Sequence, residues 1–105
     1  MTVEMQKDSE VLNVKIAGSL DIKTAPELRK QLQGELQDVN SIIFDLEKTD
    51  YTSSAGLRVL LEAFQVIHKK GGTMTMKNVN DTFYDILQIS GFTEFLDIQR
   101  AQDRQ

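Results

Sequence analysis

The residue types best suited to chemistry gather in one short segment, Thr49–Leu61. Ser53 and Ser54 lie there, with Gly56 two positions further on, between an apolar run that predicts a buried strand and an apolar pattern that predicts a helix. The start of a helix carries unpaired backbone N–H groups and a partial positive charge. A hydroxyl at that place can cap the helix, and a phosphate would be stabilised there. The sequence therefore predicts that these serines either cap the helix or accept a phosphate.

The rest of the chain offers few groups that could catalyse a reaction. The single histidine, His68, falls near the end of the predicted helix with no carboxylate or hydroxyl at a suitable spacing, and we expect it on the surface. Tyr51 and Thr52 stand where a G-x-S-x-G nucleophile elbow needs a glycine. No metal-ligand spacing occurs, and Gly71-Gly72 follows a helix, the reverse of a phosphate-binding loop. We expect no enzyme activity, no metal and no cofactor.

Length and composition restrict the class of protein further. A chain of 105 residues, 40% hydrophobic, predicts one small folded domain with a single core. The net charge is −4 and no basic cluster occurs, which argues against direct binding of nucleic acid. The lack of cysteine excludes disulfides and is compatible with the cytosol. There is no signal-peptide pattern and no run of about 18 apolar residues, so we expect a cytoplasmic protein that does not insert into membranes.

Hydrophobic periodicity predicts the elements in the first third of the chain. Alternation favours strands over Thr2–Lys7 and Val11–Ala17, joined by a hairpin turn at residues 8–10. A helix should then begin at Thr24, which would cap it in a capping box completed by Glu27. The inner face of this helix consists of leucines four residues apart: Leu28, Leu32 and Leu36.

The remainder of the chain alternates strands and helices. The run Ser41–Leu46 has an unbroken apolar centre, typical of a strand with both faces covered. The next helix covers about residues 54–70 and ends at Gly71-Gly72. Thr73–Lys77 alternates as a strand, and Asn80 can cap a short helix that ends before Gly91. Four apolar residues after that glycine should return to the core in a short helix or strand: Phe92, Phe95, Leu96 and Ile98.

This order of elements predicts an α/β fold. Strands separated by helices should be parallel, through right-handed crossovers, whereas the first two strands should form an antiparallel hairpin. The result is a mixed sheet of four to five strands packed with helices. We expect residues 1–100 to form the domain and residues 101–105 to be a frayed C-terminal tail.

Three segments of the chain resemble the STAS domain family, in particular the bacterial anti-sigma-factor antagonists. Gly18–Arg29 is similar to the loop–helix signature of that family, Asp50–Leu60 to its phosphorylation-site segment, and Leu87–Leu96 to its C-terminal pattern. The segments occur in the family's order and at family-like spacing over nearly the whole chain. The expected fold is therefore a single STAS-like domain.

The resemblance implies a partner-switching function. In that family the unmodified antagonist binds an anti-sigma factor that is also a serine kinase, and thereby frees the sigma factor. The kinase phosphorylates the antagonist, which is then released, and a serine phosphatase resets it. Ser54, two positions before Gly56, matches the phosphorylated serine. Ser53, which stands where the family often has aspartate, is the alternative acceptor.

The resemblance also implies a partner-binding surface that combines the Gly18–Thr24 loop, the Thr49–Gly56 loop and the exposed flank of the long helix. Asp21 would be its polar anchor, although ordinary turn chemistry before a helix also explains this residue. Arg58 and Glu62 would contact the partner or form a surface pair one helical turn apart. A different function stays open, that of a non-phosphorylated STAS scaffold subunit in a signalling or lipid-transport complex. The expected partner-binding residues are Asp21, Thr24, Asp50, Thr52, Ser53, Ser54, Gly56 and Arg58.

Overall fold

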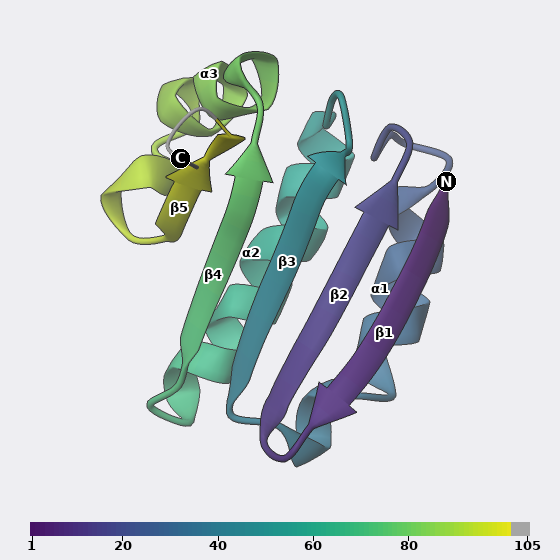
Figure 1. The fold of residues 1–105 in the computed structure, drawn as a ribbon, viewed down its shortest axis with the longest axis vertical. Helices are drawn as coiled ribbons and strands as arrows, with labels where there is room; N and C mark the ends of the chain where they lie inside the picture. The colour runs from purple at the N-terminus through teal and green to yellow at the C-terminus, as the bar shows by residue number, and fades with distance from the viewer. Residues whose placement is uncertain (102–105) are drawn as a thin grey trace.

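Each strand of the sheet lies beside the strand that precedes it in the chain. The computed structural model describes residues 1–101, and its sheet has the order β1-β2-β3-β4-β5 (Figure 1). β1 pairs with β2 antiparallel, and the other three pairs are parallel, which confirms the mixed sheet. The strands are β1 (Thr2–Asp8), β2 (Val11–Ala17), β3 (Ser41–Lys48), β4 (Thr73–Val79) and β5 (Asp97–Arg100).

A tight hairpin joins the first two strands, as predicted. Asp8 pairs with Val11, so that Ser9 and Glu10 form the turn between them. Ser9 has a φ of 58°, the left-handed conformation that such two-residue turns require. The register continues to the other end of the hairpin, where Thr2 pairs with Ala17.

Helices cover only one face of the sheet. α1 (Ala25–Gln33) and α2 (Ser54–Lys69) both lie behind the sheet in Figure 1, while α3 (Asp81–Ile89) lies near the end of β4. Ile43 faces away from the helices and is only half-buried. The prediction that both faces of this strand are covered is therefore wrong, because the crossovers through α1 and α2 pass on the same side. The buried face is built from Leu12, Val14, Ile16, Ile42, Phe44, Leu46, Met74 and Met76.

The start of α1 differs from the predicted capping box. Thr24 precedes the helix, but its side chain accepts no capping hydrogen bond, because its backbone already has helical angles (φ −94°, ψ −22°). The helix also ends at Gln33, before Gly34, which is a poor helix residue. Leu36 therefore lies in a separate 3₁₀ turn, η1 (Leu36–Asp38), but is buried as predicted.

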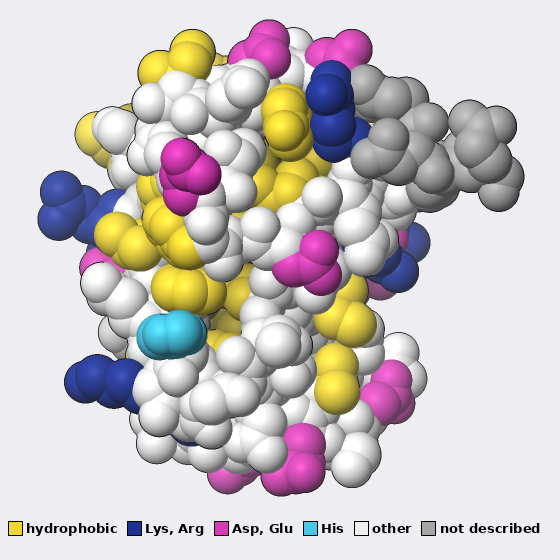
Figure 2. Space-filling model, turned by 90° about the vertical axis from the view of Figure 1, so that its left-hand side faces the viewer, with side chains coloured by type: hydrophobic (Ala, Val, Ile, Leu, Met, Phe, Trp, Pro, Cys, Tyr) yellow, Lys and Arg dark blue, Asp and Glu magenta, His cyan; other side chains and the backbone are white. Residues whose placement is uncertain are grey.

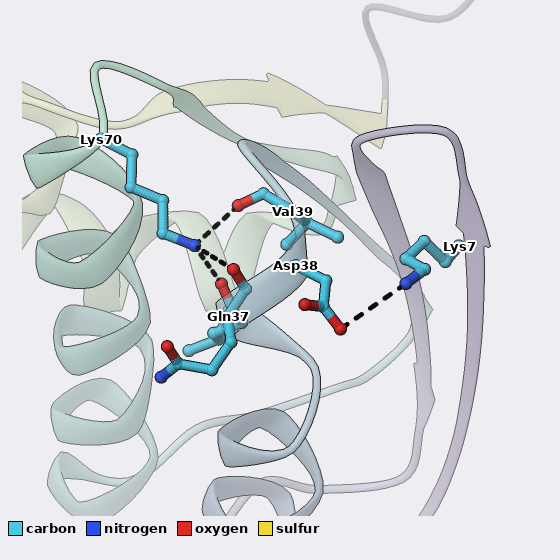
Figure 3. A network of polar contacts seen from close by, with 6 residues as sticks. Lys7, Gln37, Asp38, Val39 and Lys70 are labelled. Atoms are coloured by element: carbon cyan, nitrogen blue, oxygen red, sulfur yellow. Dashed lines mark hydrogen bonds and ion pairs between the residues drawn. The ribbon is translucent and has the colours of Figure 1, made fainter.

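A lysine ties the end of α2 to this 3₁₀ turn (Figure 3). The Lys70 ammonium donates hydrogen bonds to the carbonyl of Leu36, to that of Gln37 at 3.1 Å and to that of Val39 at 2.9 Å. Gly71 follows with a φ of 77°, which confirms that the glycine pair ends the helix. The contact fixes the connection between α1 and β3 against the far end of α2.

The C-terminal elements largely follow the prediction. Asn80 caps α3 by accepting the Phe83 N–H at 2.8 Å. A 3₁₀ turn, η2 (Phe92–Glu94), then leads into β5, so that the closing segment contains both a helical turn and a strand. Phe92 and Leu96 are buried, whereas Phe95 is 43% exposed and does not return to the core. Most of the predicted tail, residues 102–105, lies outside the described residues, and the prediction is untested there.

Within residues 1–101, no helix combines the length and apolarity that crossing a membrane requires.

Candidate functional site

Two loops far apart in sequence meet at the carboxyl ends of the neighbouring strands β2 and β3. Residues 18–24 follow β2 and residues 49–53 follow β3, at neighbouring ends of parallel strands. The Leu20 N–H donates to the Tyr51 carbonyl at 2.9 Å, and the Ser53 N–H donates to the Leu20 carbonyl at 2.9 Å. We refer to these two segments as the paired loops. They bring the predicted residues of both loops together at the start of α2.

Buried polar contacts hold the second of the paired loops in place against the elements packed under it. Thr49 is fully buried, and its hydroxyl donates to the Ile16 carbonyl at 2.7 Å. The Asn80 side-chain amide donates to the Thr49 carbonyl at 3.0 Å. Sequence reasoning found Asn80 as a helix cap but missed this second contact, because nothing local indicates a partner 31 residues away. The loop that carries the serines is thus anchored to β2 and to the start of α3.

The two serines have different structural roles. Ser53 is the N-cap of α2, with extended backbone angles (φ −91°, ψ 176°), and its hydroxyl accepts the Gly56 N–H at 3.4 Å. Ser54 is the first residue of the helix, and its side chain is exposed. Within residues 1–101, no hydrogen bond engages its hydroxyl. The structure therefore separates the capping hydroxyl from a free hydroxyl at the positive end of the helix.

Two of the predicted site residues lie beneath this surface. Thr52 is 2% exposed, and Gly56 is also buried. A Cβ on Gly56 would lie 2.3 Å from the Thr52 Oγ1 and 2.7 Å from the Leu20 Cγ. The glycine thus allows the helix to begin in close contact with both paired loops, and these two residues support the site rather than form its surface.

Asp21 organises the first of the paired loops. Its Oδ1 accepts the N–H of Lys23 at 2.9 Å and that of Thr24 at 3.0 Å, while the Thr24 hydroxyl accepts the Asp21 N–H at 2.8 Å. The hydrogen bond from the Thr24 N–H, and then that from Lys23, lower the pKa of Asp21 below its usual value. The carboxylate is therefore ionised near neutral pH, and the Thr24 hydroxyl is engaged within this closed turn rather than at the start of α1.

The other predicted charged residues are exposed. Asp50 lies in the second paired loop, and Arg58 lies one turn into α2. The predicted pair between Arg58 and Glu62 is wrong, because Glu62 instead receives hydrogen bonds from Arg29 of α1 at 2.8 and 3.2 Å. This contact ties α1 to α2 and leaves the Arg58 side chain in solvent.

His68 lies too far from the serines to act on them. It is 14 residues after Ser54 on the same helix, which places it roughly 21 Å further along the axis. Its exposed ring stacks on Phe64, with centroids 5.1 Å apart. Figure 2 shows the imidazole beside a group of hydrophobic side chains. Within residues 1–101, histidine and acidic side chains form no group of three that could hold a metal ion.

The opposite face of the sheet carries a separate charged residue, Asp45. Partial burial raises the pKa of this carboxyl, but the hydrogen bonds from Asn78 and Glu47 and the nearby charges of Lys77 and Lys15 outweigh that effect and lower it. The bond from the Asn78 amide is 2.9 Å long. Asn78 adopts a left-handed φ of 60° at an irregularity in β4, which turns its side chain toward Asp45.

Comparison with known proteins agrees with this architecture. The "Anti-sigma-B factor antagonist" of Bacillus subtilis is 26% identical over 98% of this chain and 94% of its own length. The "Anti-sigma F factor antagonist" of Paenibacillus polymyxa is 30% identical over 93% of this chain and 86% of its own length. The solved structure of the Bacillus cell fate determinant SpoIIAA in its phosphorylated form has a TM-score of 0.75 at 17% identity, covering 97% of this chain and 95% of that one.

The family model for the STAS domain matches residues 2–103. That range includes all five strands and both paired loops. The curated relatives match over nearly the same length. The chain therefore belongs to the STAS domain family.

Proposed function

We propose that this protein is a cytoplasmic anti-sigma-factor antagonist that works by partner switching. In its unmodified form it binds an anti-sigma factor that is also a serine kinase. The kinase phosphorylates Ser54, the modified protein is released, and a serine phosphatase restores the first state. The names of the relatives support the first part of this proposal. The observation that carries the rest is the hydroxyl of Ser54, which is exposed at the end of the paired loops and does not serve as the helix cap.

A phosphate on Ser54 would change binding rather than fold. Phosphoserine adds about −1.5 to −2 charges, and the N-terminal end of a helix favours an anion. The Ser53 cap does not involve the Ser54 hydroxyl, so that modification leaves the cap intact. A partner that covers the site, however, must strip water from the phosphate, on a surface whose two loops also carry the carboxylates of Asp21 and Asp50. Affinity therefore falls while the domain stays folded.

The test combines phosphorylation with binding. Purified anti-sigma factors with kinase domains from the source organism are incubated with the protein and ATP, and the modified residue is located by mass spectrometry. We expect phosphate on Ser54, none on Ser54→Ala, and continued modification of Ser53→Ala. Ser54→Asp should bind the same anti-sigma factor about 100-fold more weakly than Ser54→Ala, which corresponds to ~3 kcal/mol.

Three results would contradict the proposal. Phosphate found on Ser53, or phosphorylation of Ser54→Ala at the rate of the wild type, would refute the choice of Ser54 as acceptor. If no kinase modifies the chain and it instead purifies in a stable multi-protein assembly, the scaffold function would replace partner switching.

A further inference from the structure

Two large apolar side chains are exposed to solvent on the paired loops. Ile22 is 75% exposed and Tyr51 is 46% exposed. Each lies on a different loop, and the backbone bond between Leu20 and Tyr51 joins the two loops. One exposed apolar side chain is ordinary on a protein surface. Here two of them lie on loops that backbone hydrogen bonds join, and the second of these loops leads directly into Ser54 at the start of α2.

The backbone that carries these side chains is held in place before any partner binds. Ile22 lies within the turn that the Asp21 carboxylate closes through the N–H groups of Lys23 and Thr24. Tyr51 accepts the Leu20 N–H through its carbonyl and precedes the buried Thr52. A side chain presented on a fixed backbone loses less conformational entropy on binding than one on a loop that must first become ordered.

We infer that Ile22 and Tyr51 are the apolar anchors by which this protein binds the anti-sigma factor that phosphorylates it, an inference that rests on the proposed function. A kinase that brings the γ-phosphate of ATP to the Ser54 hydroxyl must cover the start of α2, and therefore the loops joined to it. Its facing surface needs apolar pockets for the two side chains. Tyrosine is also enriched among the residues that dominate the energy of protein interfaces.

This arrangement assigns affinity and release to different residues. The apolar anchors supply affinity that depends little on ionic strength, because burial of apolar surface involves no charge. The phosphate acts beside them and opposes binding through its charge. Removal of an anchor should therefore weaken binding before modification, whereas phosphorylation should weaken it further.

The experiment measures binding by isothermal titration calorimetry with the purified anti-sigma factor that phosphorylates the wild-type chain. Ile22→Ser and Tyr51→Ser should each bind about 10-fold more weakly or worse, with a less negative heat-capacity change. Tyr51→Phe, which keeps the ring, should bind like the wild type. Ile89→Ser is the matched control, because Ile89 is 86% exposed but lies at the end of α3 rather than on the paired loops. Thermal denaturation confirms that each variant is folded.

The possible outcomes distinguish failure of the apolar anchors from failure of the proposed function. If Ile22→Ser and Tyr51→Ser bind like the wild type while phosphate on Ser54 still releases the partner, the anchors are refuted and the proposed function stands. If Tyr51→Phe binds as weakly as Tyr51→Ser, the hydroxyl rather than the ring makes the contact, which refutes the apolar role of Tyr51. If no such kinase binds the wild-type chain, both proposals fail.

Discussion

Replacement of each of the two adjacent serines by alanine should have a different effect on stability. Ser53→Ala removes the hydroxyl that accepts the Gly56 N–H at the start of α2. Loss of such a cap typically costs about 1 kcal/mol. The bond here is 3.4 Å long, near the upper limit for hydrogen bonds, so we expect a loss of about 0.5–1 kcal/mol. In a domain of this size that lowers Tm by roughly 2–4 °C.

Ser54→Ala should leave stability unchanged or raise it slightly. Ser54 is the first helical residue, its side chain is exposed, and alanine has the higher helix propensity by about 0.5 kcal/mol. Urea denaturation of the wild type and both variants gives the free energy of unfolding, provided that the slopes agree. Ser53→Asp is the matched control, because aspartate also caps helices and should retain the stability of the wild type.

The reasoning would be refuted if Ser54→Ala cost as much as Ser53→Ala, because Ser54 would then be the cap. A loss in Ser53→Asp equal to that in Ser53→Ala would show that the hydroxyl does something other than capping.

Three further predictions concern the residues that hold the fold around the site. Gly56→Ala should unfold at a Tm several degrees lower, because the added Cβ would lie 2.3 Å from the Thr52 Oγ1; an unchanged Tm would contradict the close contact. Lys70→Met should lower the free energy of unfolding, measured by urea denaturation, by about 2 kcal/mol, since it leaves three carbonyls without their charged donor. The same substitution at the exposed neighbour, Lys69→Met, should lower it little, and equal losses in the two variants would show that the Lys70 hydrogen bonds do not stabilise the fold. Asp45 has a folded-state pKa below 3.8, so the stability it contributes is complete above that value and falls as pH drops through the folded pKa. The difference in unfolding free energy between wild type and Asp45→Asn should therefore shrink below pH 3.8, and a constant difference down to pH 2 would disprove this.

Local patterns in the sequence were sufficient for most of the elements. Alternation marked β2, and Asn80 was recognised as the N-cap of α3, because caps depend on neighbours three residues away. The serine pair marked the start of α2 but did not reveal which of the two hydroxyls caps it. The left-handed glycines likewise marked the ends of α2 and α3. The candidate acceptor followed from the same local evidence together with the family resemblance.

Contacts between distant segments could not be predicted in this way. Glu62 pairs with Arg29, 33 residues earlier, although Arg58 is its neighbour on the helix. An apolar run such as β3 does not reveal whether one or both faces are covered, since this depends on the side on which the helices pass. The exposure of Ile22 and Tyr51 could also not be predicted from the sequence, because apolar residue type alone suggests burial.

The match between chain order and spatial order has a consequence for synthesis of the protein. As the chain leaves the ribosome, each strand after the first emerges when the neighbour it pairs with has already been synthesised. β1, β2 and β3 can therefore associate before β4 and β5 have been made. No strand must later be inserted between two that have already paired. The last strand to emerge adds to an outer edge, and the nascent sheet grows in one direction from its first hairpin.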